Sequence, residues 1–250
     1  MGQLDGKTGL VVGASRGLGR GIAEQLSAAG AGVVAVARSP GALAELVSAH
    51  PRIRTEVADA TDPTVAGELL SRHQPDILAL VAGARSLLRP VHHHTWETFS
   101  LNWQVDVRMA FHWVREALLL PLRPGSQILV MSSGAAIHGS PMSGGYAGAK
   151  ATLRFLAAYA NEESHRAGLG ITVSAVLPRL TPETELGRAA VAAYAARSGA
   201  SEDQFLARMG PPVTPQIAGD AFVAIATAGS DGGAYELTGD GLKKLSATGM

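Results

Sequence analysis

The feature that most constrains the fold is a regular alternation between short apolar runs and longer amphipathic runs along the whole chain. Most of the short runs are apolar throughout rather than at every second position, which is typical of strands covered on both faces. The predicted strands are 9–12, 32–37, 53–57, 77–81, 126–132, 171–177 and a more polar 234–237. The predicted helices are about 18–27, 40–49, 63–72, 95–119 and 146–167. These repeated strand–helix units predict an α/β fold, in which about seven strands form one doubly wound parallel sheet with helices on both faces.

The composition agrees with one domain over residues 1–250 and argues against several other classes of protein and of binding site. Hydrophobic residues make up 46% of the chain, enough for a large core, and no linker or repeat divides it. Charge is balanced, with 21 basic and 21 acidic residues and no basic stripe, which argues against a nucleic-acid partner. The absence of cysteine excludes disulfides and thiolate metal sites. Because no apolar run could span a bilayer and residues 1–9 do not resemble a signal peptide, we expect a cytoplasmic protein without a membrane partner.

The glycine-rich stretch VVGASRGLGRG at 11–21 supports two interpretations. GASRG matches the nucleophile elbow of a serine hydrolase, but an elbow follows a central strand, and Ser15 follows the first one. In the other interpretation Gly13 allows a tight turn, and Gly17 and Gly19 allow close backbone approach and helix packing. The following helix then directs its free N–H groups at a phosphate. The second interpretation uses more of the residues and predicts a Rossmann-type dinucleotide site.

The residues after the second predicted strand favour NADP(H) over NAD(H). An NAD site needs an acid there for the ribose 2′-hydroxyl, whereas an arginine accommodates a 2′-phosphate. The chain has Arg38 and Ser39 at this point and no acid. Arg16, in the glycine loop, supplies a second cation for the same phosphate. The alternative is that both arginines are solvated surface residues.

Ser133, Tyr146 and Lys150 form the candidate catalytic set. Ser133 follows the predicted strand 126–132 and precedes Tyr146 by thirteen residues. Tyr146 and Lys150 are four residues apart on a predicted helix, so their side chains share one face. A lysine ammonium near a phenol favours the phenolate, so Lys150 would tune the acidity of Tyr146. A Y-x-x-x-K pair alone is common on ordinary helices, but with the serine and the glycine loop it indicates an oxidoreductase. Tyr146 is then the proton donor, and Ser133 orients the carbonyl oxygen.

With these motifs the chain resembles the short-chain dehydrogenase/reductase family over essentially its whole length, as a diverged member. The matching residues are GASRGLG at 13–19, Asp59, Ala82, Gly83, Ser133, Tyr146, Lys150 and Pro178. The resemblance implies that Asp59 contacts the adenine and that Tyr146 and Lys150 also hold the nicotinamide ribose. It also implies a homotetramer or homodimer formed through the helices at about 95–119 and 146–167. The expected cofactor site comprises Gly13, Ser15, Arg16, Gly17, Leu18, Gly19, Arg38, Ser39, Asp59, Ala60, Ala82, Gly83, Tyr146, Lys150, Pro178 and Thr181.

Two linked departures from the family lie in loops that face each other. Val12 stands where the family has a threonine, and Leu80-Val81 stands where it has two asparagines. In the family these polar residues help to tie the two loops together. Removing both partners of a buried hydrogen bond can be nearly neutral, whereas removing one is costly. We therefore interpret the changes as a compensated repacking.

A third departure concerns the fourth catalytic residue, an asparagine in the family. Aligning VDVRMAF with the family pattern puts Asp106 at this position, with Asn102 one turn earlier as the fallback. An anion close to Lys150 would stabilise the ammonium while offsetting its field at Tyr146. We therefore expect a more alkaline activity optimum than an asparagine would give.

Two further segments bear on the substrate side. Arg179 replaces a family glycine after Pro178; it could orient a substrate, narrow the pocket or face the solvent. The helix-prone insertion at 179–212 follows a late strand, where ligands bind in open α/β sheets, so we interpret it as a substrate lid. Its alternative is a surface helical pair with no ligand contact. The run His92–His94 is expected to be a loop before a helix capped by Thr95 and close to the active-site mouth, and no metal is assigned to it.

The leading hypothesis is an NADPH-dependent reductase of a small-molecule ketone, or an alcohol dehydrogenase working in reverse. A second hypothesis keeps the fold without net redox chemistry, as an epimerase or lyase that uses Tyr146 as acid or base. A third is an NADP-binding regulatory or scaffold protein with degraded catalysis. The departures at Val12, Leu80-Val81, Asp106 and Arg179 together support it.

Overall fold

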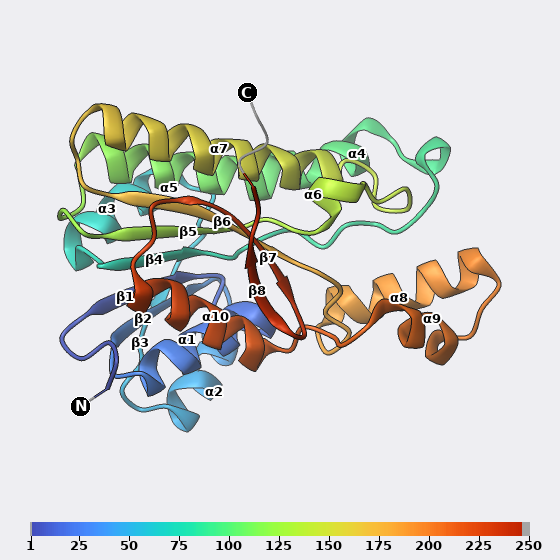
Figure 1. The fold of residues 1–250 in the computed structure, drawn as a ribbon, viewed down its shortest axis with the longest axis horizontal. Helices are drawn as coiled ribbons and strands as arrows, with labels where there is room; N and C mark the ends of the chain where they lie inside the picture. The colour runs from blue at the N-terminus through green and yellow to red at the C-terminus, as the bar shows by residue number, and fades with distance from the viewer. Residues whose placement is uncertain (1, 247–250) are drawn as a thin grey trace.

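The computed structural model describes residues 2–246 and consists of one eight-stranded sheet between two layers of helices (Figure 1). The strand order is β3-β2-β1-β4-β5-β6-β7-β8, parallel except for the last pair, β7 and β8, which is antiparallel. The strands are β1 Thr8–Val12, β2 Gly32–Ala37, β3 Arg54–Val57, β4 Ile77–Leu80, β5 Gln127–Met131, β6 Thr172–Pro178, β7 Gly233–Thr238 and β8 Gly241–Lys244. The doubly wound Rossmann-type prediction is confirmed, with eight strands in place of about seven.

The helices connect these strands and cover both faces. They are α1 Gly17–Ala28, α2 Pro40–Ala49, α3 Pro63–His73, α4 Trp96–Asn102, α5 Arg108–Leu119, α6 Ala135–His138, α7 Tyr146–Arg166, α8 Glu185–Ser198, α9 Glu202–Met209 and α10 Pro215–Ala228. Three of them start with a proline after a capping side chain: Ser39 bonds the N–H of Ala42, Asp62 that of Thr64, and Thr214 that of Ile217. These caps satisfy backbone donors that a helix start leaves unpaired.

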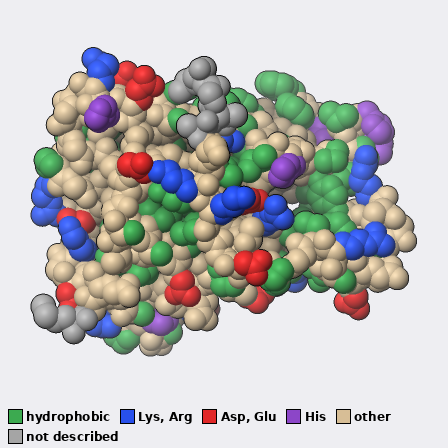
Figure 2. All heavy atoms as spheres, viewed as in Figure 1, with side chains coloured by type: hydrophobic (Ala, Val, Ile, Leu, Met, Phe, Trp, Pro, Cys, Tyr) green, Lys and Arg blue, Asp and Glu red, His purple; other side chains and the backbone are tan. Residues whose placement is uncertain are grey.

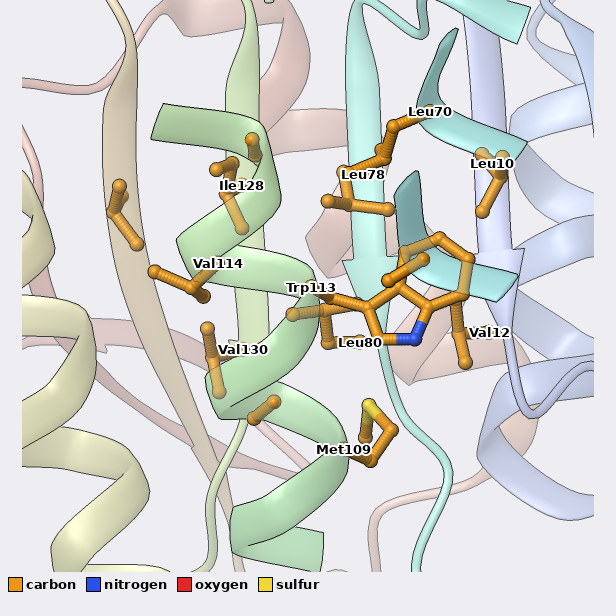
Figure 3. Packing of buried hydrophobic residues seen from close by; sticks show 14 of the residues in the cluster. Leu10, Val12, Leu70, Leu78, Leu80, Met109, Trp113, Val114, Ile128 and Val130 are labelled. Carbon is orange, nitrogen blue, oxygen red and sulfur yellow. The ribbon is translucent and has the colours of Figure 1, made fainter. Parts of the chain in front are cut away.

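Each face of the sheet has its own hydrophobic core. On one face α3, α5 and α7 pack against the strands, with α5 and α7 along the top of Figure 1. On the other face α1, α2 and α10 form the second core. The largest buried side chain is Trp113 of α5, which packs over Leu80 and Val12 (Figure 3) and donates its indole N–H to the carbonyl of Ala60 at 3.0 Å. Burial of the ring therefore leaves no orphaned donor.

The segment predicted as a helix over about 95–119 is helical from Trp96 to Leu119, but it contains a π-helical turn that was not predicted. The segment is α4, a π-helical turn at Trp103–Val107, and α5. A π-turn inserts an extra residue into the helix and is frequent at functional sites. Asp106 lies in this turn and is completely buried, so the irregularity coincides with a candidate catalytic residue.

The chain reverses direction across the sheet between β1 and β4, which lie side by side although β2 and β3 separate them in sequence. Ligands of open α/β sheets bind at such a switch point, beyond the carboxyl ends of the strands. The helices α8 and α9 extend from this edge as an arm at the right of Figure 1. Within residues 2–246 no helix combines the length and the apolar character needed to cross a membrane.

Candidate active site

A cleft of about 570 Å³ lies at the switch point and is rich in charged side chains; we call it the charged cleft. Every residue expected at the cofactor lines it, with the exception of Ser39. The Ser39 hydroxyl instead accepts a hydrogen bond from the N–H of Ala42 at 3.4 Å and so caps α2. The clustering brings together residues from six separate chain segments: 13–19, 38, 59–60, 82–83, 146–150 and 178–181.

The glycine loop leaves no room for side chains at two positions. Gly13 has φ +95°, and a Cβ added to it would lie 2.6 Å from the backbone N of Ala82. A Cβ on Gly19 would lie 2.1 Å from the carbonyl oxygen of Gly13. Both distances are far below contact, so the loop must carry glycine there. α1 then starts at Gly17 without a side-chain cap from Arg16, which leaves its first N–H groups directed at the cleft.

The loops after β1 and β4 are joined without the family's polar side chains. Val12 and Leu80 are buried in the same core cluster. The N–H groups of Val81 and Ala82 both donate to the carbonyl of Val12 at 2.9 Å. The two loops are therefore tied by backbone hydrogen bonds and apolar packing, as a compensated repacking requires.

Arg38 and Asp59 both line the cleft, and their charges interact. Hydrogen bonds from the N–H and hydroxyl of Thr61, together with the charges of Arg38 and Arg108, hold the pKa of Asp59 below its usual value. Asp59 is thus a fixed anion with oriented lone pairs. Such a group suits the exocyclic amine of an adenine.

Glu185, the first residue of α8, links the arm to the cleft. Its carboxylate bonds the guanidinium of Arg16 at 2.5 Å and that of Arg85. Both arginines line the cleft, so an internal anion occupies groups that could bind a phosphate. The sequence carried no signal for this contact, because Glu185 is 169 and 100 residues away from its two partners.

Tyr146 and Lys150 start α7 and lie together on its buried side. The ammonium of Lys150 is 5.6 Å from the centre of the Tyr146 ring and donates to the carbonyl of Met131 at 3.2 Å. The hydroxyl of Ser132 donates to the carbonyl of Lys150 at 2.7 Å, which joins the start of α7 to the end of β5. The predicted pairing of phenol and ammonium is therefore present and rigidly supported.

Asp106 forms a buried ion pair with Lys150, with 3.1 Å between Oδ2 and Nζ. Burial by itself lowers the pKa of Lys150, because it disfavours the charged ammonium. The negative charge of Asp106 and a smaller effect of Tyr146 outweigh it, so the pKa of Lys150 lies above its ordinary value. The other oxygen of Asp106 accepts from the N–H of Ala84 at 2.7 Å. A Cβ on Gly83 would lie 2.8 Å from the carboxylate, so this glycine makes room for it.

Asn102, the fallback for the fourth catalytic position, bonds Asp106, which in turn pairs with Lys150. Its amide donates to the carbonyl of Ala84 at 3.0 Å and to both oxygens of Asp106 at 3.3 Å. It also accepts from the hydroxyl of Ser86 at 2.9 Å. The anion is thus held by three kinds of donor: an ammonium, a backbone N–H and an amide.

A second cavity, of about 480 Å³, adjoins the charged cleft; we call it the apolar pocket. Ser133 and Tyr146 line both cavities, and the wall away from the cleft includes Tyr194 of α8 and Phe205 of α9. In Figure 2 the hollow at the right, between the arm and the segment above it, is lined with hydrophobic side chains. The hydroxyl of Ser133 accepts from the N–H of Ala135 at 3.2 Å, which leaves its proton available for another acceptor.

Two remaining sequence features have structural partners. Arg179 lines both cavities, but its Nε donates to Glu236 of β7 at 2.7 Å. In the histidine run, His94 lies 3.2 Å from both the Thr98 hydroxyl and the Arg89 carbonyl, and Thr95 caps α4 as expected. Among residues 2–246 there is no cluster of histidine and acidic side chains suited to a metal ion.

Comparison with known proteins points to one family. A family model described as short chain dehydrogenase matches residues 7–195. Hydroxynaphthalene reductase-like protein Arp2 of Metarhizium robertsii is 32% identical over 187 residues, which cover 70% of this chain and 68% of that protein. L-xylulose reductase of Mesocricetus auratus is 38% identical over 105 residues, which cover 42% of this chain and 43% of that protein. The chain thus spans less than half the length of the xylulose reductase that it matches.

Proposed function

This chain belongs to the short-chain dehydrogenase/reductase family, and on that premise we propose that it reduces a ketone with NADPH, or oxidises the matching alcohol in reverse. Members of the family use NAD(P)(H), and the relatives reported above are named as reductases. The observation that carries the proposal is that Ser133 and Tyr146 line both the charged cleft and the apolar pocket. A carbonyl group bound in the pocket would meet these two hydroxyls beside the cleft.

The residues of the charged cleft suit a dinucleotide. The glycine loop and the uncapped start of α1 suit the diphosphate, and Asp59 suits the adenine. Arg38 favours a 2′-phosphate, because β2 is followed by this cation and by no acid. Arg16 would join it after leaving Glu185. Ser39 does not line the cleft, but its hydroxyl only accepts the N–H of Ala42 and keeps a proton that could be donated to the same phosphate.

The chemistry follows from the groups at the junction of the two cavities. When bound, NADPH supplies a hydride to the carbonyl carbon. Ser133 donates a hydrogen bond that orients the carbonyl oxygen, and Tyr146 transfers its hydroxyl proton to that oxygen, which yields the alcohol. Lys150 remains an ammonium because Asp106 stabilises its charge, and it favours the phenolate that Tyr146 leaves behind.

We also propose that residues 179–212 form a substrate lid on a single domain over 1–250. Tyr194 of α8 supports this role. Its hydroxyl lies 2.6 Å from the hydroxyl of Ser140, which lines the apolar pocket outside the arm, so this contact links the arm to the rest of the pocket wall. A homodimer or homotetramer through α5 and α7 is proposed as well. Phe111 of α5 is 48% exposed and Phe155 of α7 is 53% exposed, and exposed apolar groups that gather into one patch mark contact sites.

The test combines cofactor binding with turnover. NADPH binding is measured by fluorescence titration, and a panel of ketones is then offered to the wild type, Tyr146→Phe and, as matched control, the exposed Tyr159→Phe. We expect turnover that falls by about 10²- to 10⁴-fold in Tyr146→Phe and is unchanged in Tyr159→Phe. NADPH binding without turnover of any ketone or alcohol would favour a regulatory protein. Turnover that survives Tyr146→Phe would refute the mechanism.

A further inference from the structure

The apolar pocket contains almost no charge. Within residues 2–246, no acidic residue and no lysine lines it. The two titratable groups other than Tyr146 and Tyr194 are His138 and Arg179, and the latter is paired with Glu236. An anionic or cationic substrate would leave water for a pocket without a free counter-charge, which is costly. The pocket therefore suits a neutral molecule.

The hydroxyl groups of the lining are largely engaged with the protein itself. Ser86 donates its only proton to Asn102 at 2.9 Å, and Ser143 donates to the carbonyl of Ser140 at 3.0 Å. Ser140 and Tyr194 bond each other at 2.6 Å. A substrate with many hydroxyls would lose its hydrogen bonds to water here and regain few, at a cost for each unsatisfied group. Polyhydroxylated ketones are thus disfavoured.

One wall of the pocket is a pair of parallel aromatic rings. The rings of Tyr194 and Phe205 have centroids 6.3 Å apart and planes inclined by 13°. A third ring between them would need roughly 7–8 Å, twice the usual carbon–carbon contact distance, so the pair acts as one surface. The N–H of Met142 also donates to the Tyr194 hydroxyl at 3.2 Å, which fixes the position of this ring. An aromatic surface of this kind favours a flat ring packed against it.

We propose, on the basis of the reductase function above, that the substrate is a neutral ketone with a flat apolar ring system, such as a bicyclic aryl ketone. The carbonyl lies at Ser133 and Tyr146, while the ring system lies against Tyr194 and Phe205. The aromatic pair is the specificity determinant, because it is the element of the wall that distinguishes a flat ring from a flexible chain.

The first arm of the test compares substrates. Reduction of 1-tetralone, a bicyclic aryl ketone, is measured against ribulose, a ketopentose, and cyclohexanone, with NADPH present. We expect kcat/KM for 1-tetralone to exceed that for ribulose by at least about 100-fold. Phe205→Ala should lower kcat/KM for 1-tetralone by about 10-fold through KM and change that for cyclohexanone little. The exposed Leu120→Ala serves as a control for loss of an apolar side chain.

The second arm needs no turnover. Binding of 2-naphthol to wild type and Phe205→Ala is measured by calorimetry, and we expect about 10-fold weaker binding in the variant. Equal affinity in the two proteins, or ribulose reduced as efficiently as 1-tetralone, would overturn the substrate class and leave the reductase function standing. Binding of 2-naphthol that depends on Phe205, with no ketone reduced, would support the ligand class and refute the reductase function.

Discussion

The charged cleft and the apolar pocket meet at shared residues, which include Ser133, Tyr146 and Arg179, but they differ strongly in charge. In the described part of the chain, five arginines, Lys150 and four acidic side chains line the cleft. The basic groups of the pocket there are His138 and Arg179, and Arg179 is shared with the cleft. The cleft thus resembles a site for a charged ligand held by many polar contacts, and the pocket one for a neutral ligand held by shape. A proton donor at their junction can serve a reaction between two such ligands.

The two cavities also differ in the part of the fold that forms most of their walls. The cleft rests on the carboxyl ends of β1, β2, β3, β4 and β5, where the sheet holds each residue in place. The outer wall of the pocket belongs to α8 and α9, which extend from the sheet as an arm (Figure 1). Substitutions in the cleft should therefore change stability and the binding of a charged ligand, whereas substitutions in the pocket should change substrate preference.

The largest effect, a loss of stability, is expected from substitution of Asp106, the buried anion of the cleft. Asp106→Leu leaves the ammonium of Lys150 without its anion inside the protein, so we expect the free energy of unfolding to fall by about 3–5 kcal/mol. Urea denaturation measures this change. Asp231→Leu, which removes an exposed ion pair with Lys244, is the control and should leave the midpoint unchanged. A normal midpoint for Asp106→Leu would mean that the cleft carries no strongly coupled buried charge.

The second prediction tests whether the cleft recognises a phosphate. Arg38→Leu removes the cation after β2, so NADPH binding should weaken by roughly 10- to 100-fold while NADH binding changes little. Fluorescence titration with both dinucleotides measures the ratio, and NADH serves as the internal control. An equal loss for the two cofactors would assign Arg38 to the adenosine and not to the 2′-phosphate.

Much of the cleft could be predicted from the sequence because its residues stand at strand ends with fixed spacing. The thirteen residues from Ser133 to Tyr146 and the glycines after β1 carry that signal in local sequence. The contact of Glu185 with Arg16 and Arg85 could not be predicted, since ion pairs between distant segments leave no periodic pattern. The role of Ser39 stays a prediction, because the same serine can cap a helix as an acceptor and contact a cofactor as a donor.

The fold was predicted best where the apolar pattern is unambiguous. β8 was missed because Gly241–Lys244 is short, polar and on the edge of the sheet, where one covered face suffices. The π-turn at Trp103–Val107 was missed because one extra residue hardly disturbs the spacing of apolar positions over two long helical runs. The pose of α8 and α9, and with it the aromatic wall, depends on tertiary contacts such as Tyr194 to Ser140.

The third prediction separates the charge of Asp106 from its hydrogen bonds. Asp106→Asn keeps an acceptor for the N–H of Ala84 but removes the anion, so the pKa of Lys150 should fall. In the wild type the raised pKa of Lys150 stabilises the fold. This stabilisation is fully present at a pH below the pKa of lysine in the unfolded chain, about 10.4, and is lost as the pH rises through the pKa of Lys150 in the folded protein. The stability difference between the two proteins should therefore be constant near neutrality and shrink in strong alkali.

The same substitution should change the pH dependence of activity. Without the anion, the ammonium of Lys150 acts on Tyr146 with its full field, so the optimum for alcohol oxidation should move about one unit toward lower pH. A pH–rate profile of both proteins measures the shift. Superimposable profiles would show that the buried charge next to Lys150 has no influence on the proton donor.

The smallest effect, a change in cofactor affinity, is expected at the contact between the arm and the cleft. Glu185 is 42% exposed and holds Arg16 away from a cofactor phosphate, so Glu185→Gln should tighten NADPH binding by about two- to five-fold. Because Arg16 is freed for a 2′-phosphate, the gain for NADH should be smaller. Glu163→Gln, which breaks an exposed pair with Arg166 on α7, should change neither affinity. Weaker NADPH binding in Glu185→Gln would mean that the arm assists the cleft by positioning Arg16, and the two regions would then act as one site.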